Sequence, residues 1–241
     1  MLFNNPRFTG GLGMSVQIRT KIESWWSYIE AAAIEIGDQV LELKGGLDGE
    51  GPHYWINGVP GDEDVKNDQH LKDLEKYLTA RLAVFSVHYK KISSKQHKFR
   101  IDLPNGDAIS MQTWKHLVAV HVNAKKNENF AGAAGLMGSY PSGSMIGRDG
   151  KTVISDEIVF GQEWQVSGEE RMLFHSTEGA QYPTKCIMPD QAKMEASKQR
   201  RLGESLIARD SAQLACARAT DQESCISDVL AMNDIEVAGA Y

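Results

Sequence analysis

The sequence predicts a mainly β protein: an antiparallel β-sandwich with a helical insertion and a small C-terminal α-helical appendage. Many short segments alternate apolar and polar residues, which is typical of half-buried strands. Asn–Gly turn signals lie between several of these segments. The composition changes near the C-terminus. We therefore expect a β domain over residues 1–188 and a helical, cysteine-bearing module over residues 189–241.

The predicted strands follow one another along the first part of the chain. In residues 13–22, Met14, Val16 and Ile18 alternate with polar neighbours. Residues 53–58 run into an Asn57–Gly58 turn, which is a strong hairpin signal. The other segments read as strands are 25–37, 39–46, 97–103, 108–112 and 114–124.

Helical spacing interrupts this pattern twice. Between Asp64 and Leu82 four leucines recur at helical intervals in a charged background, which predicts a surface helix inserted between strands. From Pro189 the chain is rich in Ala, Glu, Lys, Arg and Leu and has no aromatic residue before Tyr241, which predicts two or three short helices. The linker is expected within residues 183–197.

The overall charge and hydropathy exclude some classes of protein. The formal net charge of −6 argues against a nucleic-acid binder, because phosphate contact needs a basic face. No window reaches the roughly 18 apolar residues of a membrane span. The first residues, MLFNNPRFTGG, lack the basic start and apolar run of a signal peptide and begin like the tail of a strand. We expect the natural protein to extend upstream of Met1.

Three cysteines leave at least one thiol without an internal partner. In one interpretation the protein is intracellular and its thiols are free. In the other it is secreted, Cys216 pairs with Cys225, and Cys186 lacks its partner. The cysteine count leaves both open.

Catalytic and metal-site motifs are absent from the sequence. It contains no H-E-x-x-H, C-x-x-C or G-x-S-x-G, and no base is evident that could activate a serine in the SYPSGS segment. We expect a non-catalytic protein. The tryptophans fall in alternating segments and are expected in the core. The alternative is a lectin-like carbohydrate-binding β-sandwich, which predicts a line of exposed aromatic side chains on one sheet face.

The stretch GLMGSYPSG, residues 135–143, concentrates three glycines and a proline. It matches neither the P-loop pattern nor the dinucleotide-binding pattern. Calcium prefers several oxygen ligands, with two or more carboxylates among them. The donors in and after this stretch predict at most a weak calcium site, formed by Ser139, Ser142, Asp149 and Asp156, with Ser144 nearby.

A basic run, KQRRL, follows the predicted linker. Arg200 and Arg201 form either a cleavage site for a basic-specific processing protease or part of a solvated basic patch on a helix.

In order and spacing, these motifs resemble the von Willebrand factor type D domain from about Phe8 to Cys186. GLGMSVQIRTKI, AAAIEIGDQVLEL and YWINGV look like successive strands of the family, and FGQEWQV stands where the family has F-G-x-x-W-x-V. GLMGSYPSG stands where it has G-L-C-G-N-x-N-G. The WWSYIEAAAIEIG block and the ending DVLAMNDIEVAGAY are similar to D-domain proteins of microalgae such as diatoms.

The resemblance implies roles for particular residues. Gly135, Gly138, Gly143 and Trp164 are the fold fingerprint. Met137 replaces a family cysteine, so Leu136 and Met137 are expected to fill the space of a disulfide. Ser139 and Ser142 replace stronger calcium ligands.

The opening segment and first strand of the family are missing, so the resemblance implies an N-terminally truncated domain. The resemblance also favours the secreted interpretation of the cysteines, so a disulfide between Cys216 and Cys225 is expected. Cys186 would then be an unpaired thiol facing an open sheet edge with an exposed apolar strip.

The same resemblance implies a function. Such domains are non-catalytic extracellular or cell-surface modules that support adhesion, matrix or multimer formation. The expected partners are other proteins or further copies of the chain, and calcium is the only cofactor implied. The export signal is expected upstream of Met1.

Overall fold

The computed structural model describes residues 1–22, 27–46, 52–62, 64–82, 85–125, 129–166, 170–175, 195–196, 199–200, 203 and 205–241. Contacts divide the chain into two units. One comprises Met1–Thr20 and Ile29–Cys186, and the other Lys21–Tyr28 and Ile187–Tyr241. The predicted domain boundary at residue 188 lies outside the described residues.

The first quarter of the chain forms a six-stranded sheet whose spatial order follows the sequence, β1-β2-β3-β4-β5-β6. Its strands are β1 (Phe3–Asn5), β2 (Met14–Ile22), β3 (Ser27–Ile36), β4 (Gln39–Lys44), β5 (His53–Ile56) and β6 (Val59–Pro60). A short helix, α1 (Phe8–Gly11), lies between β1 and β2. The turn from β5 to β6 has both Asn57 and Gly58 at positive φ, as an Asn–Gly hairpin requires.

A four-stranded sheet of consecutive hairpins follows, in the order β10-β9-β8-β7. It consists of β7 (Ser86–Lys91), β8 (Gln96–Asp102), β9 (Ala108–Trp114) and β10 (Leu117–Asn123). A 3-10 turn, η1 (Pro104–Gly106), connects β8 to β9 where the sequence predicts a turn. The prediction of a mainly β protein with antiparallel sheets is confirmed.

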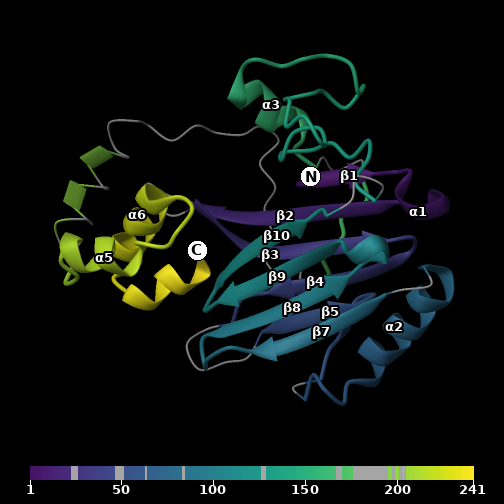
Figure 1. Ribbon diagram of the computed structural model, residues 1–241, viewed down its shortest axis with the longest axis horizontal. Helices are drawn as coiled ribbons and strands as arrows, with labels where there is room; N and C mark the ends of the chain where they lie inside the picture. Colours follow the sequence, from purple (N-terminus) through teal and green to yellow (C-terminus); the bar gives the residue numbers. More distant parts are fainter. Residues whose placement is uncertain are drawn as a thin grey trace. The chain divides into compact units, whose positions relative to one another are not determined.

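The two sheets share one hydrophobic core. The side chains that the alternation assigns to one face of each strand lie in this cluster, for example Val16 from β2, Phe99 from β8 and Met111 from β9. The rings of Tyr54 and Phe99 meet between the two sheets, with centroids 5.3 Å apart. Figure 1 shows the sheets as two layers, with β7–β10 forming one of them.

The predicted helical insertion is the helix α2 (Gln69–Leu82). All four of its leucines are buried in the shared core, so their helical spacing marks the face of α2 that packs against the sheets. The Glu75 carboxylate accepts a hydrogen bond from the Val87 backbone N–H (2.5 Å), which fastens α2 to the edge strand β7.

Asp68 lies at the N-terminal end of α2 and is almost fully buried. Its carboxylate accepts hydrogen bonds from the Tyr54 hydroxyl (2.5 Å) and from the backbone N–H groups of Asp62, His70 and Leu71. It thus caps the helix and joins it to β5. Burial alone would raise the pKa of Asp68, but the hydrogen bonds outweigh burial and hold that pKa below its ordinary value.

A short strap, residues 171–175, lies across the face of the six-stranded sheet that points away from the core. Leu173 and Phe174 form a second apolar cluster with side chains of β3 and β4. Gln17 donates from Nε2 to the Arg171 carbonyl (2.9 Å) and accepts from the Leu173 N–H (3.1 Å). The buried Glu42 accepts from the His175 N–H (2.7 Å). No periodicity in this short segment predicts such a strap.

The described helices of the C-terminal unit are α5 (Arg209–Ala215), α6 (Gln222–Met232) and the 3-10 segment η2 (Ile235–Ala240). Asp221 caps α6 by accepting from the Ser224 N–H (3.1 Å), and Asn233 ends it in the left-handed conformation. Within the part of the chain that the structure describes, every helix is too short or too polar to cross a membrane.

Replacing Asp68 by Ala should lower the free energy of unfolding by about 2–4 kcal/mol, because the helix cap and the acceptor for the buried Tyr54 hydroxyl are lost together. Urea unfolding at neutral pH measures this change. The exposed Asp73, on the same helix, is the matched control, and Asp73→Ala should change stability by less than about 0.5 kcal/mol.

Comparing the wild-type protein with Asp68→Ala at several pH values tests whether the charge of Asp68 contributes to stability. A carboxyl with a lowered folded-state pKa stabilises the fold above its unfolded pKa, and this contribution is lost as pH falls through the folded value. The wild-type protein should therefore lose more stability below about pH 4 than Asp68→Ala does. Parallel pH profiles of the two proteins would contradict this assignment.

Candidate functional site

Glycine is required at two points of the GLMGSYPSG loop for steric reasons. A Cβ on Gly135 would lie 2.2 Å from the Leu2 carbonyl oxygen. Gly138 has φ +80°, and its Cβ would lie 2.4 Å from the Gly143 carbonyl oxygen. The loop closes on itself through hydrogen bonds from the Ser139 N–H to the Ser144 carbonyl (2.9 Å) and from the Gly143 N–H to the Ser139 carbonyl (2.7 Å).

The loop lies against the outer edge of β1. Asn4 and Ala134 exchange backbone hydrogen bonds of 2.8 and 3.1 Å, and the Met137 N–H donates to the Leu2 carbonyl (3.2 Å). The outer edge of β1 is therefore closed by backbone, and the open edge that was expected to face Cys186 lies outside the described residues. Backbone of the glycine loop lies directly against this edge, and this explains why Gly135 has no room for a side chain.

The expectation that Leu136 and Met137 fill the space of a disulfide is wrong. Leu136 is 37% exposed and Met137 is 51% exposed. The Gly135 backbone lies directly against β1, so the two following side chains project outward from the sheet edge. They add an apolar patch to the surface beside the loop.

The predicted calcium donors separate into local pairings. The hydroxyls of Ser139 and Ser142 bond to each other (2.8 Å). Asp149 accepts from the backbone N–H groups of Lys151 and Thr152, each at 2.9 Å, and from the Thr152 hydroxyl. These hydrogen bonds, the Thr152 hydroxyl first, hold the pKa of Asp149 below its ordinary value.

Asp156, the other predicted carboxylate ligand, is the N-cap of α3 (Glu157–Glu163) and accepts from the Ile158 and Val159 N–H groups at 2.9 Å. Both carboxylates thus serve as local caps. Over the described ranges, no group of three or more His, Cys, Asp or Glu side chains could hold a metal ion.

Trp164, the remaining fingerprint residue, is buried and holds the loop region to α3. Its Nε1 donates to the Ile146 carbonyl (3.0 Å), and the Arg148 guanidinium lies over its ring at 5.2 Å. Arg148 also donates to the Gln165 carbonyl (3.0 Å) and pairs with Glu170. These contacts give Trp164 a structural role.

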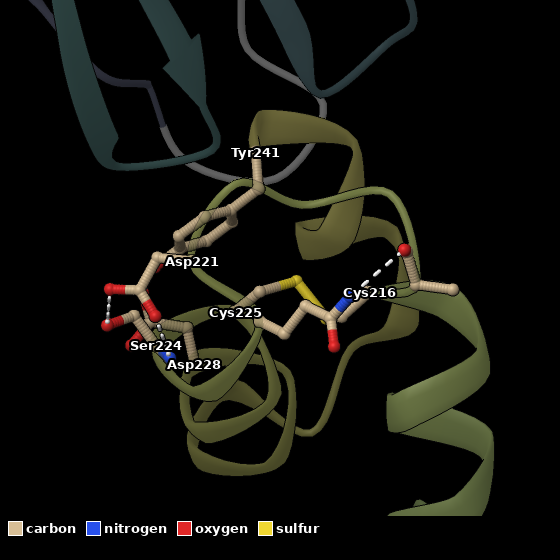
Figure 2. The surroundings of a disulfide bond; sticks show 8 residues. Cys216, Asp221, Ser224, Cys225, Asp228 and Tyr241 are labelled. Carbon is tan, nitrogen blue, oxygen red and sulfur yellow. Dashed lines mark hydrogen bonds between the residues drawn. A yellow bond between two sulfur atoms is a disulfide. The ribbon is translucent and has the colours of Figure 1, made fainter.

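The predicted pairing of Cys216 with Cys225 is confirmed. The two residues form a disulfide with a Cα–Cα distance of 5.8 Å and are completely buried between α5 and α6. Figure 2 shows the bond beside Tyr241, whose hydroxyl bonds to Asp228. Burial raises the pKa of Asp228 and that of Tyr241.

Other predicted residues lie partly outside the described residues. Cys186 and Arg201 are among these, and Arg200 is described and exposed. Trp25 and Trp26 are also outside the described residues. Among the tryptophans that the structure does describe, Trp114 and Trp164 are buried and Trp55 is half-buried.

A second candidate site is the outward face of the four-stranded sheet. The register aligns its side chains in two rows across neighbouring strands, while the alternate residues, such as Phe99 and Met111, point into the core. We name this surface the basic sheet face and define it by Lys90, Lys98 and Gln112 in one row and by His88, Arg100, Ser110 and His121 in the other.

This sheet is the basic part of an acidic protein. Residues 86–125 contain seven Lys and Arg residues but only two acids, Asp102 and Asp107, so their formal net charge is +5. The rest of the chain therefore carries −11. Asp107 is buried, where it accepts from the Lys125 N–H and from Asn129, so Asp102 is the acid on the basic sheet face.

The basic sheet face already holds one carboxylate. Asp102 lies between Arg100, whose Nε donates to it at 2.8 Å, and His88, whose Nε2 is 2.9 Å from its other oxygen. His88 and Arg100 face each other in the register, and their side chains are 62% and 38% exposed. The Asp102 carboxylate thus contacts one side chain from β7 and one from β8.

The other row places two like charges directly opposite each other. Lys90 on β7 faces Lys98 on β8, an arrangement that destabilises a sheet. Lys98 also lowers the pKa of His121. Burial lowers the pKa of His121, and the positive charge of Lys98 lowers it further. Within the part of the chain that the structure describes, neither Lys90 nor Lys98 forms an ion pair that would compensate this charge.

Unpaired donors occur at one end of the same face. Gln96 and Trp114 are opposite each other in the register, and both are buried. Gln96 Nε2 and Trp114 Nε1 have no hydrogen-bond acceptor among the described residues. A buried unpaired donor costs roughly 1–3 kcal/mol, so this end of the face favours an added acceptor.

Sequence reasoning based on the net charge of the whole chain missed the basic sheet face. The signal that identifies it is local. The run from Lys90 to Arg100 holds five cations and no acid, on two segments that alternate as strands. Counting charge by segment would have found it.

Gly135→Ala should destabilise the protein by about 1–3 kcal/mol, because the new Cβ would overlap the Leu2 carbonyl and push the loop off β1. Amide hydrogen exchange at Asn4 and Met137, which hydrogen-bond across this contact, should become faster. Gly161→Ala is the control, since its Cβ meets nothing within 4 Å and it lies inside α3. Equal exchange in the two variants would show that the close approach at Gly135 is unimportant.

Lys98→Gln should raise the pKa of His121, because it removes a positive charge that disfavours the imidazolium. NMR titration of the histidine ring protons measures the shift. Lys90→Gln is the matched control, because Lys90 is not among the causes of the lowered His121 pKa. If both variants leave the pKa of His121 unchanged, Lys98 and His121 do not belong to the same charged surface.

Neither a protein-family model nor a curated protein matches the chain. The resemblance to the von Willebrand factor type D domain therefore rests on the motifs and their order.

Proposed function

We propose that the chain is a non-catalytic extracellular interaction module of the von Willebrand factor type D kind, which supports adhesion or assembly outside the cell. The observation that carries this proposal is the buried disulfide between Cys216 and Cys225. Such bonds persist in oxidising compartments and are rare where thiols are kept reduced. Of the two interpretations of the cysteines, the disulfide favours the secreted one.

The size of the surrounding helical unit explains why a disulfide matters there. The described apolar core around Cys216 and Cys225 is small, consisting mainly of side chains from α6 and one from each of α5 and η2. Closing a loop of nine residues adds about 2–3 kcal/mol by limiting the unfolded chain. A unit of this size gains much of its stability from that bond, as small secreted domains do.

The exposed apolar patch at the glycine loop supports the assembly part of the proposal. Leu136 and Met137 project from the outer edge of β1. Contiguous exposed apolar surface on a folded protein often marks a contact with another protein. The partners we propose are other proteins or further copies of this chain.

Two measurements on cells that make the protein test its location. A membrane-impermeant amine label applied to intact cells, or to their medium, should modify the protein. Alkylation without reductant, followed by mass spectrometry, should find Cys216 and Cys225 unmodified because they are bonded to each other. An abundant intracellular protein is the control and should stay unlabelled. A protein protected from the label, with both thiols alkylated, would rule out the extracellular proposal.

Sedimentation velocity over a range of concentrations tests assembly on the purified protein. If the apolar patch mediates self-association, the double variant Leu136→Ser, Met137→Ser should shift the protein toward monomer. Val153→Ser is the matched control, because Val153 is also an exposed apolar side chain. A wild-type protein that is monomeric at all concentrations would leave other proteins as the partner and exclude self-assembly.

A further inference from the structure

We propose that the basic sheet face binds a linear polysaccharide that carries carboxylate groups. The inference rests on the proposed function only in placing the protein where such polymers occur. Three observations carry it: the concentration of positive charge on one sheet of an acidic protein, the opposed Lys90–Lys98 pair, and the carboxylate already held by His88 and Arg100.

Charge complementarity selects an anionic partner. The opposed lysines lie close together, and among the described ion pairs neither has an acidic partner. Like charges in this position weaken the sheet, and a bound anion would offset that cost. The Asp102 arrangement shows which anion suits the face, since a carboxylate there receives nitrogen contacts at 2.8 and 2.9 Å from two strands.

The spacing of the strands suits a linear polymer. Neighbouring strands are about 4.8 Å apart, so each row presents its side chains at short regular intervals across the sheet. A chain laid across the strands meets Lys90, Lys98 and then Gln112 in turn. Ser110 and Gln112 are themselves buried, so the groups of the face that a ligand can reach are its charged side chains.

Two other anionic polymers fit the face less well. Single-stranded nucleic acid binds through aromatic side chains that stack on its bases, and the tryptophan on this face, Trp114, is buried. A double helix is usually read by a helix or ribbon that enters a groove, whereas this surface is the face of a sheet. An acidic peptide gains affinity by adding to a sheet edge, where free backbone groups are available. These polymers are therefore competing outcomes of the test.

Isothermal titration of the purified full chain with oligogalacturonate tests the proposal. Wild-type protein should bind it, and binding should weaken as salt rises. Lys90→Gln with Lys98→Gln should reduce affinity by on the order of tenfold or more, since two charge-assisted contacts are lost. The matched control, Lys76→Gln with Lys151→Gln, removes the same charge from exposed sites away from this face and should bind as wild type does.

A second measurement separates a binding role from a structural one. Removing one member of an opposed like-charge pair should leave the melting temperature of Lys98→Gln unchanged or raise it. A variant that loses both ligand binding and thermal stability would indicate that Lys98 supports the fold, and it would overturn the assignment.

The remaining outcomes are decisive as well. Absence of binding, or equal loss in the two double variants, would overturn the proposal. Equal binding of a neutral dextran would show that charge is not what the face recognises. Tighter binding of duplex DNA or polyglutamate at the same salt would assign the face to nucleic acid or to acidic protein. Because this assay uses purified protein, a failed surface-labelling experiment would remove the extracellular proposal and leave this site standing.

Discussion

The shared core between the two sheets is the constraint on which the rest of the structure depends. It requires each strand to turn one set of alternate side chains inward, so Val16, Phe99 and Met111 are committed to packing. The side chains at the other alternate positions point outward and do not have to pack in this core. A one-residue slip would exchange the two sets, burying Lys98 and exposing Phe99, so the register that builds the core also assembles the rows of cations.

The two sheets use their outward faces differently. The six-stranded sheet buries Ala31, Ala33 and Val40 under the strap, and the polar groups there are satisfied by the backbone of residues 171–175. That face is closed by the chain itself. The four-stranded sheet carries long cationic side chains over a floor of Ser110 and Gln112. Its most exposed side chains include His88.

Much of the fold was predictable because period-2 and period-3.6 patterns report which face is buried. The strands from Met14 to Ile56 and the four leucines of α2 are examples. Three features escaped that reasoning. The strand Ser86–Lys91 has only Val87 and Tyr89 between polar residues, the strap is too short to show a period, and the edge of β1 is closed by backbone hydrogen bonds, which leave no side-chain pattern. Leu136 and Met137 were misplaced for the same reason.

The candidate sites divide along a similar line. Disulfide pairing depended on two cysteines close in sequence and was predictable, whereas the oxygen donors near the glycine loop were grouped by proximity along the chain alone. In three dimensions Asp149 and Asp156 each accept hydrogen bonds from N–H groups of their own turn or helix, so each carboxylate is held by its local segment.

The basic sheet face could not be found from proximity along the chain, because its lysines and its arginine come from β7 and β8 and become neighbours only through strand pairing. Stability alone does not explain this arrangement. A sheet that needed only solubility would interleave acids with Lys90, Lys98 and Arg100, and the chain has acids to spare outside this sheet. The opposed lysines are retained although they weaken the sheet. This is expected if another molecule supplies the negative charge that neutralises them.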